Sequence, residues 1–389
     1  MKYDVAVIGA GIAGAAVAAN LAASKSVVVI ERESHPGYHA TGRSAALFSE
    51  VYGNDVVRKL SIAGRPFLAD PPNGFSTSPI LTPRGAMHVG TSADLEVLDR
   101  LYESAHRLVP SVRRLDSREV RERVPVLRTE FVAGGVIEPD AMDIDTNELL
   151  QAYLRQIRQR DGRILVDAEV LGLTRGGAGW ILETRAGKVE AGIVVNAGGA
   201  WADDIARMAG ARPVGLIPKR RTVFVFTPPS DIDVRTWPLV IGARENFYFK
   251  PDAGNLLVSP ADETPSRPMD AQAEELDVAI AADRLMSATS LEVRHIQHRW
   301  AGLRTFTADK TPVSGFDPEI EGFLWHAGQG GYGFQTAPGM GSYTAALAMG
   351  KPIPANLQDL GLTDQALSPA RFVAKNQDAA PGGRAVAGE

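Results

Sequence analysis

A glycine-rich turn near the amino terminus constrains the fold of this chain more than any other feature. The turn reads Gly9-Ala10-Gly11-Ile12-Ala13-Gly14, and an apolar run over 3–8 precedes it. An alanine-rich stretch over 15–23 follows, and a second apolar run over 27–30 ends in Glu31. This order of strand, glycine turn, helix, strand and acid is typical of a dinucleotide-binding unit. The sequence therefore predicts a parallel β–α–β unit that binds an adenine dinucleotide.

Each glycine of this turn has a predicted role. Gly9 allows the tight turn, Gly11 lets the backbone approach a pyrophosphate, and Gly14 lets the helix lie close to the strand. The helix N-terminus offers free N–H groups to the phosphates, and Glu31 stands where a carboxylate can accept hydrogen bonds from ribose hydroxyls. The expected contacts in this unit are Gly9, Gly11, Ile12, Ala13, Gly14, Glu31 and Arg32.

Composition excludes several other classes of protein. The net charge of −5 over 389 residues argues against nucleic acid as a partner. The chain has no cysteine, which excludes disulfides, thiolate metal ligands and a cysteinyl cofactor link, and its seven histidines show no metal-ligand spacing. We therefore expect no metal.

The uncharged stretch from Val5 to Ala23 is long enough to resemble a membrane span, but its three glycines, its asparagine and its many alanines make it a poor one. The first strand begins within the first few residues, so we expect no cleavable leader, no transmembrane segment and a cytoplasmic location.

Periodicity and turn signals give the remaining elements. The expected helices are 55–69, 95–108, 117–124, 145–160, 272–286 and 336–349. A strand meander is expected over 163–190, followed by a buried strand at 193–197 and another at 323–327. Strands such as 222–227, 247–250 and 256–259, together with the helix at 272–286, indicate an antiparallel sheet with a helix on it.

Three further segments carry a resemblance to a known family. They are Tyr38–Ala46, Val195–Trp201 and Gly328–Gly333, and they are joined by the strings Pro218–Arg221, Phe249–Gly254 and Trp300–Arg304. Together they resemble the D-amino-acid oxidase superfamily of FAD enzymes. That superfamily includes glycine oxidase, sarcosine oxidase and the bacterial D-amino-acid dehydrogenases, and the similarity is greatest to the D-arginine dehydrogenases. It extends from the first strand to about Arg371.

The resemblance implies a fold and a division of the chain. The expected class is α/β (α+β), with a Rossmann-type FAD-binding domain and an inserted antiparallel-sheet substrate domain. The FAD-binding domain is expected in three pieces, 1–78, 142–212 and 306–372. The substrate-binding domain is expected at 79–141 and 213–305, and a disordered tail at 376–389.

The resemblance also implies how FAD is held. Backbone donors and hydroxyls of the segment around Thr41 would line the pyrophosphate and the flavin edge, and the backbone of Val170 would hold the adenine. The helix after Gly333 would direct its positive end at the flavin N1–C2=O edge, where hydride transfer leaves negative charge. The implied contacts are Thr41, Gly42, Arg43, Ser44, Ala45, Ala46, Val170, Ala197, Gly198, Trp201, Arg304, Gly328, Gly330, Gly331, Tyr332, Gly333, Gln335 and Thr336.

The flavin is expected to be non-covalent. Without cysteine, only a histidyl link remains, and His39 stands where some relatives, such as dimethylglycine dehydrogenase, form one. The dehydrogenases that this chain resembles more closely leave their flavin free.

Two arginines are the candidate ligands of a substrate carboxylate. Guanidinium offers the planar pair of donors that a carboxylate matches, and Arg304 and Arg221 coincide with substrate-contacting arginines of the family. Arg220 and Arg221 are adjacent, so on a strand they face opposite sides. The candidate catalytic residues are Tyr52, Tyr248, Arg304 and Arg221. The resemblance adds Gly331, Gln335, Leu47, Ser49 and Ala86 to the expected substrate contacts.

Two departures from the family bear on the substrate. Where the D-arginine dehydrogenases carry an acid that grips the guanidinium, this chain has Ala86, and where they carry a histidine it has Leu47. A cationic side chain would then be buried without a counter-charge, unless Glu50 or another acid moves in. This favours a neutral, apolar or aromatic side chain. The absence of the histidine leaves Tyr52, a water molecule or bulk solvent to deprotonate the substrate amine.

The activity expected from the resemblance is oxidation of a D-amino acid to its imino acid, with hydride passing from Cα to flavin N5. A secondary amine, such as an N-methyl amino acid or D-proline, and glycine fit the same site geometry. A 2-hydroxy acid would need a general base near its Cα–OH, and a non-catalytic flavoprotein is the remaining alternative. The motifs are shared by oxidases and dehydrogenases, so the electron acceptor is O2 or a quinone or other carrier.

Overall fold

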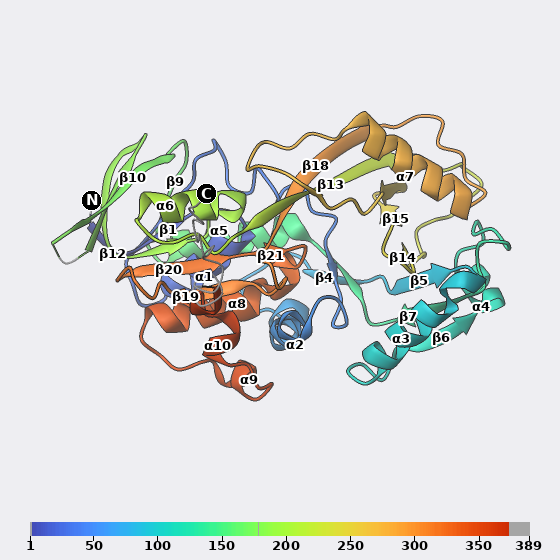
Figure 1. The fold of residues 1–389 in the computed structure, drawn as a ribbon, viewed down its shortest axis with the longest axis horizontal. Helices are drawn as coiled ribbons and strands as arrows, with labels where there is room; N and C mark the ends of the chain where they lie inside the picture. Colours follow the sequence, from blue (N-terminus) through green and yellow to red (C-terminus); the bar gives the residue numbers. More distant parts are fainter. Residues whose placement is uncertain (1, 178, 373–389) are drawn as a thin grey trace, which may run out of the picture.

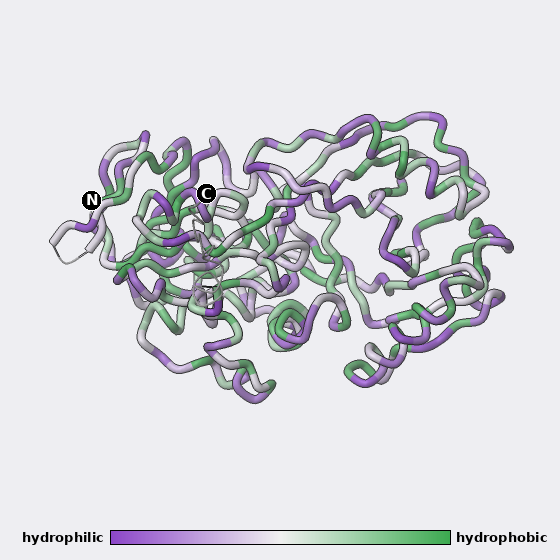
Figure 2. The backbone as a smooth tube through the Cα atoms, viewed as in Figure 1, coloured by the Kyte–Doolittle hydropathy of each residue, from purple (hydrophilic) through white to green (hydrophobic). Residues whose placement is uncertain are grey.

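The computed structural model describes residues 2–177 and 179–372, and it contains two large β-sheets side by side (Figure 1). The tail expected at 376–389 lies outside the described residues. In Figure 2, which colours each residue by hydropathy, apolar residues follow the strands and helices of both halves of the molecule. No helix in these two ranges is both long enough and apolar enough to cross a membrane.

The first sheet has eight strands and contains the predicted dinucleotide-binding unit. Its main path runs β10-β11-β12-β1-β2-β9, and β20 adds to β12 and β19 to β20. The strands are β1 (Lys2–Ile8), β2 (Val27–Ile30), β9 (Arg163–Leu165), β10 (Val170–Gly176), β11 (Gly179–Thr184), β12 (Gly187–Asn196), β19 (Val313–Phe316) and β20 (Phe323–Ala327). The strands from β9 through β2, β1 and β12 to β20 are parallel. β12 is one continuous strand where the sequence predicted two shorter ones.

Both faces of this sheet are buried, as parallel sheets require. Val5 and Val7 of β1 point to the face covered by the helices α1 (Ile12–Leu21), α5 (Thr146–Gln159) and α8 (Gly333–Ala348). Ala6 and Ile8 alternate to the other face, which α6 (Ala202–Met208) helps to cover. The small residues of α1 permit close packing, since a Cβ on Gly341 of α8 would lie 3.0 Å from Ala16.

The second sheet has ten strands. Its path runs β21-β18-β13-β16-β15-β14-β5-β7-β6, with β17 beside β13. The strands are β5 (Ala86–Gly90), β6 (Arg113–Asp116), β7 (Gly134–Glu138), β13 (Ile217–Phe226), β14 (Leu239–Gly242), β15 (Tyr248–Asp252), β16 (Asn255–Ser259), β17 (Thr264–Pro265), β18 (His298–Phe306) and β21 (Gln329–Gly330). The prediction of an antiparallel sheet is wrong at one pair, because β5 and β14 run parallel. These two strands come from separate insertions, so no hairpin dictates their direction.

Helices cover the face of this sheet that points away from the first sheet. α7 (Glu275–Ala288) packs on it through Val278, Ala281 and Leu285, and α4 (Ser117–Arg123) packs through Val120. α3 (Leu95–His106) packs on the opposite face, where Leu98 and Ala105 cluster with Val136 of β7 and with Val51. The short helices α9 (Ala355–Gln358) and α10 (Asp364–Leu367) end the described chain.

A third, small sheet lies between the two large ones and was not predicted. It pairs β8 (Met142–Ile144) with β3 (Leu47–Phe48) and β4 (Leu81–Pro83). After β3 the chain enters α2 (Asp55–Ala69), where the Asn54 side chain accepts a hydrogen bond from the Val57 N–H and caps the helix.

The strands of the eight-stranded sheet come from the three pieces assigned to FAD, and those of the ten-stranded sheet come mainly from the other two. The small sheet crosses the expected boundaries near 78 and 142, because β4 pairs with β8. We therefore keep the domain division as a proposal.

Candidate active site

One cavity runs between the two large sheets and gathers most of the predicted site. Its empty space is about 1830 Å3, solvent at the mouth included. The predicted residues that line it are Gly9, Gly11, Ile12, Ala13, Glu31, Arg32, Thr41, Arg43, Ser44, Ala45, Ala46, Leu47, Val170, Ala197, Gly198, Trp201, Arg221, Tyr248, Arg304, Gly330, Gly331, Gly333 and Gln335.

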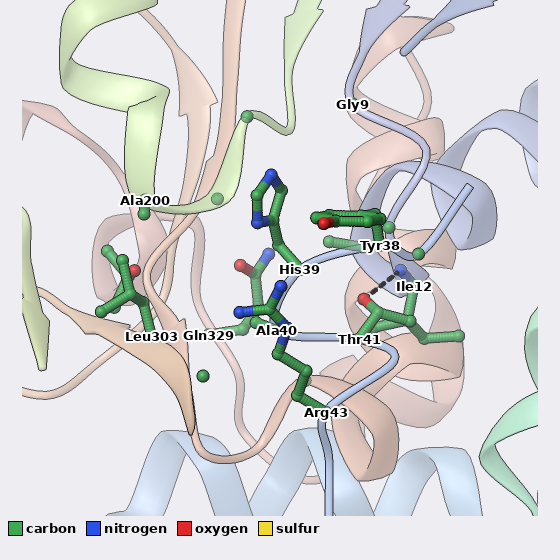
Figure 3. Close-up of a pocket in the computed structure, with 18 of the residues that line it drawn as sticks. Gly9, Ile12, Tyr38, His39, Ala40, Thr41, Arg43, Ala200, Leu303 and Gln329 are labelled. Carbon is green, nitrogen blue, oxygen red and sulfur yellow. Dashed lines mark hydrogen bonds between the residues drawn. The ribbon is translucent and has the colours of Figure 1, made fainter. Parts of the chain in front are cut away.

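At one end the cavity meets the N-terminus of α1. Gly11 has no side chain to cap this helix, and the hydroxyl of Thr41 accepts the hydrogen bond from Ile12 N at 3.1 Å instead (Figure 3). A Cβ on Gly9 would lie 2.5 Å from Ala197 O, and one on Gly14 would lie 1.9 Å from Gly9 O. Gly9 and Gly14 therefore serve backbone packing, while the helix end at Gly11 faces the cavity and fits a pyrophosphate.

Glu31 is buried at the end of β2 and holds the glycine turn. One carboxylate oxygen accepts a hydrogen bond from Ala10 N at 2.8 Å, and the other accepts one from Glu33 N at 3.0 Å. Each carboxylate oxygen can accept a second bond, so both remain available to ribose hydroxyls.

A stack of side chains follows on the same side of the cavity. The guanidinium of Arg32 lies 4.9 Å from the centre of the Trp201 ring, and the His39 ring lies 4.6 Å away. His39 Nε2 lies 2.8 Å from a carboxylate oxygen of Glu33, whereas its Nδ1 is buried without a hydrogen-bond partner.

Arg43 joins the loop over 37–46 to the ten-stranded sheet. It donates hydrogen bonds to Ala271 O at 2.8 Å and Ala301 O at 3.0 Å, and it pairs with Asp270. Three of the five N–H donors of this guanidinium are thus used in holding the loop to the sheet. Figure 3 shows Tyr38, His39, Thr41 and Arg43 projecting from this one loop around the cavity.

At the other end, Arg304 reaches the cavity from β18. Its Nη1 lies 3.5 Å from Tyr52 Oη, and no described carboxylate pairs with it. Burial lowers the pKa of Arg304, but the surrounding oxygens of Tyr52, Tyr248 and Tyr332 outweigh burial and leave that pKa above its usual value. The site therefore holds a partly buried positive charge without a negative partner among the described residues.

Arg221 and Tyr248 complete this end. Arg221 Nε donates to Asp262 O at 2.7 Å, while the neighbouring Arg220 turns the other way and pairs with Asp277 at 2.9 Å. This confirms that the two adjacent arginines face opposite sides. Tyr248 Oη is buried without a hydrogen-bond partner. Burial would raise the pKa of Tyr248, but the charges of Arg304 and Arg221 lower it below its usual value.

The register of the ten-stranded sheet explains how these residues meet. Arg304 pairs with Lys219, two residues before Arg221, and Tyr248 lies on the same face through the pairing of β13, β16 and β15. Alternate residues share a face of a sheet, so side chains far apart in the sequence converge on one surface.

Some predicted residues lie outside the lining of the cavity. They are Gly14, Gly42, Ser49, Tyr52, Ala86, Gly328, Tyr332 and Thr336. Tyr52 and Tyr332 pack on each other with ring centres 4.9 Å apart, behind Arg304. Thr336 turns its hydroxyl back to Tyr332 O at 2.8 Å. Ala86 lies two strands from Tyr248, and Leu239 of the intervening strand packs against Tyr248. The place of Ala86 in the wall of the substrate pocket stays a prediction.

Three further residues of the site carry no local sequence signal. Met269 and Ala271 line the cavity from the segment before α7, where no local motif marks them. Glu138 ends β7 opposite Ala86, with its carboxylate buried. Only the pairing of strands 50 residues apart brings it near the site.

The comparisons with known proteins agree with this geometry. The family model described as FAD dependent oxidoreductase (DAO) matches residues 4–347. The chain is 25% identical over 378 residues to glycine oxidase of Geobacillus kaustophilus, covering 93% of this chain and 97% of that one. It is 24% identical over 377 residues to N-methyl-L-tryptophan oxidase of Salmonella dublin, covering 90% and 96%.

Solved structures share the fold. The crystal structure of the Geobacillus kaustophilus glycine oxidase superposes with a TM-score of 0.81 at 24% identity and covers 93% of this chain and 98% of that one. L-proline dehydrogenase from P. horikoshii gives a TM-score of 0.81 at 22% identity and covers 96% and 98%. The expected fold and cofactor are thereby confirmed: the chain belongs to the DAO family of FAD-dependent oxidoreductases.

Proposed function

We propose that this enzyme oxidises a D-amino acid with a neutral side chain to its imino acid, which hydrolyses to the 2-oxo acid. The observation that carries the proposal is the partly buried guanidinium of Arg304, which faces the cavity and has no carboxylate partner among the described residues. Burying an unpaired charge is costly, so such a group is retained where a ligand of opposite charge completes it. A substrate carboxylate is the ligand whose two oxygens match the guanidinium.

The residues around Arg304 support a carboxylate ligand. Arg221 adds a second positive charge to the same cavity, and Tyr248 Oη between the two is free to donate a hydrogen bond. Binding the carboxylate on this side would leave Cα and the amine directed toward the part of the cavity lined by the 44–47 segment and Gly331.

FAD, when bound, supplies the acceptor for a hydride from the substrate Cα. The chain would hold it through the N-terminus of α1, Glu31 and the backbone of the 41–46 segment. The N-terminus of α8 lines the cavity at Gly333, and its positive end stabilises negative charge on a bound group. Fixing Cα through its carboxylate restricts the substrate to one orientation, which lowers the entropic part of the barrier.

The lining near Arg304 favours a neutral side chain. Ala45 and Leu47 pack against Tyr248 there, and Val223 also lines the cavity. The carboxylates that line the cavity among the described residues are Glu31, Glu169 and Asp204. Glu31 follows β2, Glu169 precedes β10 and Asp204 lies in α6, so all three are on the side of the eight-stranded sheet. Glu50 pairs with Arg65 at 2.6 Å instead of entering the cavity. A cationic substrate side chain would therefore lack a counter-charge.

Oxidation of a secondary amine is the second candidate. Two similar proteins, N-methyl-L-tryptophan oxidase and L-proline dehydrogenase, are named for substrates whose amine carries two carbon substituents. The same carboxylate site would hold such a substrate. A 2-hydroxy acid fits less well, since no described histidine, aspartate or glutamate lines the Arg304 end of the cavity to act as a base.

A substrate panel separates these candidates. The FAD-loaded enzyme is mixed anaerobically with D- and L-amino acids, N-methyl amino acids, proline enantiomers and 2-hydroxy acids, and bleaching of the flavin absorbance is followed. We expect rapid bleaching with neutral D-amino acids. Bleaching only by N-methyl amino acids or proline would replace the first candidate with the second. Bleaching only by 2-hydroxy acids would overturn both.

A further inference from the structure

Glu138 is a buried acid of the ten-stranded sheet that contacts residues 49–52, the segment between β3 of the small sheet and α2. It ends β7, and only 4% of its surface is exposed. Its Oε2 accepts a hydrogen bond from Ser49 Oγ at 2.5 Å, and its Oε1 accepts one from Glu50 N at 2.9 Å. Both carboxylate oxygens therefore hold the backbone and side chain of one short segment.

That segment, residues 49–52, leads directly to the carboxylate site. Ser49 N donates to the side-chain oxygen of Gln335 at 3.3 Å, and Gln335 lines the cavity. Tyr52, three residues later, lies against the guanidinium of Arg304 at 3.5 Å. The segment thus spans from Glu138, near one edge of the ten-stranded sheet, to Arg304, near the other.

Other contacts of the segment come from α2. Arg65 pairs with Glu50 at 2.6 Å, and Arg58 Nε donates to Val51 O at 2.9 Å. These bonds join the segment to the helix that follows it in the chain. The Glu138 hydrogen bonds tie the segment to the ten-stranded sheet instead, on the face that also carries Tyr248. Val51 of the segment packs against Val136 of β7 on this same face.

We propose that Glu138 is a positioning residue for the substrate carboxylate site: it ties Ser49 and Glu50 to the ten-stranded sheet and so keeps Tyr52 against Arg304. This inference rests on the proposed carboxylate-binding role of Arg304. Glu138 itself does not line the cavity, so it acts through Tyr52 rather than on the substrate.

The hydrogen bonds do not require Glu138 to be charged. A protonated carboxyl group, or the amide of glutamine, can donate to Ser49 Oγ while its carbonyl oxygen accepts from Glu50 N. Burial raises the pKa of Glu138 to about 7, and the nearby charge of Glu50 raises it further. The hydrogen bonds from Ser49 and from the Glu50 backbone, together with the charge of Arg65, lower this pKa but do not outweigh burial. Arg58 is the other charged side chain that acts on Glu138. Glu138→Gln should therefore preserve the position of the segment, whereas Glu138→Ala should release it.

The test measures binding of benzoate, a carboxylate that cannot be oxidised at a Cα, to the FAD-loaded enzyme by isothermal titration and by perturbation of the flavin spectrum. We expect Glu138→Ala to raise the benzoate Kd about tenfold and Glu138→Gln to change it less than twofold. Tyr52→Phe should also raise it, and adding Glu138→Ala to Tyr52→Phe should raise it little further, because both changes remove one interaction. Glu130→Ala, an exposed acid just before β7, is the matched control.

Additive effects of Glu138→Ala and Tyr52→Phe, or an unchanged Kd in Glu138→Ala, would overturn the inference. If Glu138→Ala does not fold, Ser49→Ala replaces it in the same cycle, since it removes the 2.5 Å hydrogen bond from the other side. Failure of the proposed function gives a different result, because benzoate would then bind equally well to wild type and to Arg304→Ala.

Discussion

The guanidinium of Arg304 lies flat against Gly331, so that a Cβ at position 331 would be 3.0 Å from Nη1, 3.1 Å from Cζ and 3.3 Å from Nε. The glycine loop and the arginine therefore shape one surface: the loop can approach the charged group only because residue 331 has no side chain.

Gly331→Ala tests this relationship. Its φ is not in the left-handed region, so alanine is compatible with the backbone, and the added methyl group should push the guanidinium aside. We expect about tenfold weaker binding of a carboxylate ligand with FAD content unchanged, a loss of roughly 1.4 kcal/mol. Gly172→Ala, where a Cβ meets nothing within 4 Å, is the control. Unchanged carboxylate affinity in Gly331→Ala would show that the guanidinium moves freely.

Arg304→Ala removes the proposed carboxylate contact. Truncating one member of a buried, hydrogen-bonded charge pair costs roughly 2–5 kcal/mol, so the substrate KM and the benzoate Kd should rise at least about thirtyfold while FAD is retained. Arg299→Ala is the matched control, because Arg299 lies on the same strand and pairs with Glu275 at the surface. If Arg304→Ala binds carboxylates as tightly as wild type and Arg221→Ala binds them more weakly, the carboxylate site lies at Arg221.

Neutral D-amino acids should be preferred over cationic ones. Apolar lining near Leu47 gains about 25 cal/mol per Å2 of apolar substrate surface that it covers, and it offers no counter-charge to a guanidinium. We expect kcat/KM for D-leucine, D-methionine or D-phenylalanine to exceed that for D-arginine by more than about tenfold. Steady-state kinetics on the four substrates check this, and a preference for D-arginine would show that an acid does reach the pocket.

Ala86→Glu should not create a site for a cationic substrate. The new carboxylate would stand directly opposite Glu138 in the antiparallel pair of β5 and β7, and like charges in such a pair repel. Loss of thermal stability without a gain in D-arginine oxidation is the expected result. A gain in D-arginine oxidation would instead show that residue 86 lies in the wall of the substrate pocket.

The stability of the protein should depend on Glu138 through pH. Its pKa is raised from 4.5 to about 7 in the folded state, so between these values the folded state binds more protons than the unfolded state. The contribution of Glu138 to the free energy of unfolding is therefore largest below about pH 4.5 and is lost as the pH rises toward 7. The loss is on the order of 3 kcal/mol, since each pKa unit corresponds to about 1.4 kcal/mol.

Urea unfolding at pH 5, 6, 7 and 8 measures this loss. Glu138→Gln cannot ionise at this position. As the pH rises from 5 to 8, the free energy of unfolding of wild type should therefore fall by about 3 kcal/mol relative to that of Glu138→Gln. A difference that is independent of pH would show that Glu138 has an ordinary pKa.

The flavin should be released by acid. His39, whose counterpart in some relatives forms a covalent link, is held through Nε2 by Glu33 at 2.8 Å and packs against the Trp201 ring at a tilted angle. After precipitation with trichloroacetic acid, the yellow colour should appear in the supernatant. A yellow, washed pellet from the wild type that becomes colourless in His39→Ala would demonstrate a histidyl bond.

Much of the fold could be predicted because its signals are local. The turn from Gly9 to Gly14, the apolar runs beside it and Glu31 lie within about thirty residues, and backbone geometry alone relates them. The same holds for the opposite orientation of Arg220 and Arg221, which follows from the pleat of a strand. Family motifs extended this to FAD and to Arg304, which the structure places in the lining of the cavity.

Other features depended on contacts between distant parts of the chain. The parallel pairing of β5 with β14 joins segments 150 residues apart, and no turn between them dictates its direction. The resemblance to the D-arginine dehydrogenases indicated only that Ala86 stands where those enzymes have an acid. The tertiary structure decided that Glu138 stands on the neighbouring strand and binds Ser49, 89 residues away. Local patterns determine which backbone conformations are available, whereas the environment of a buried charge is determined by whichever distant segments pack around it.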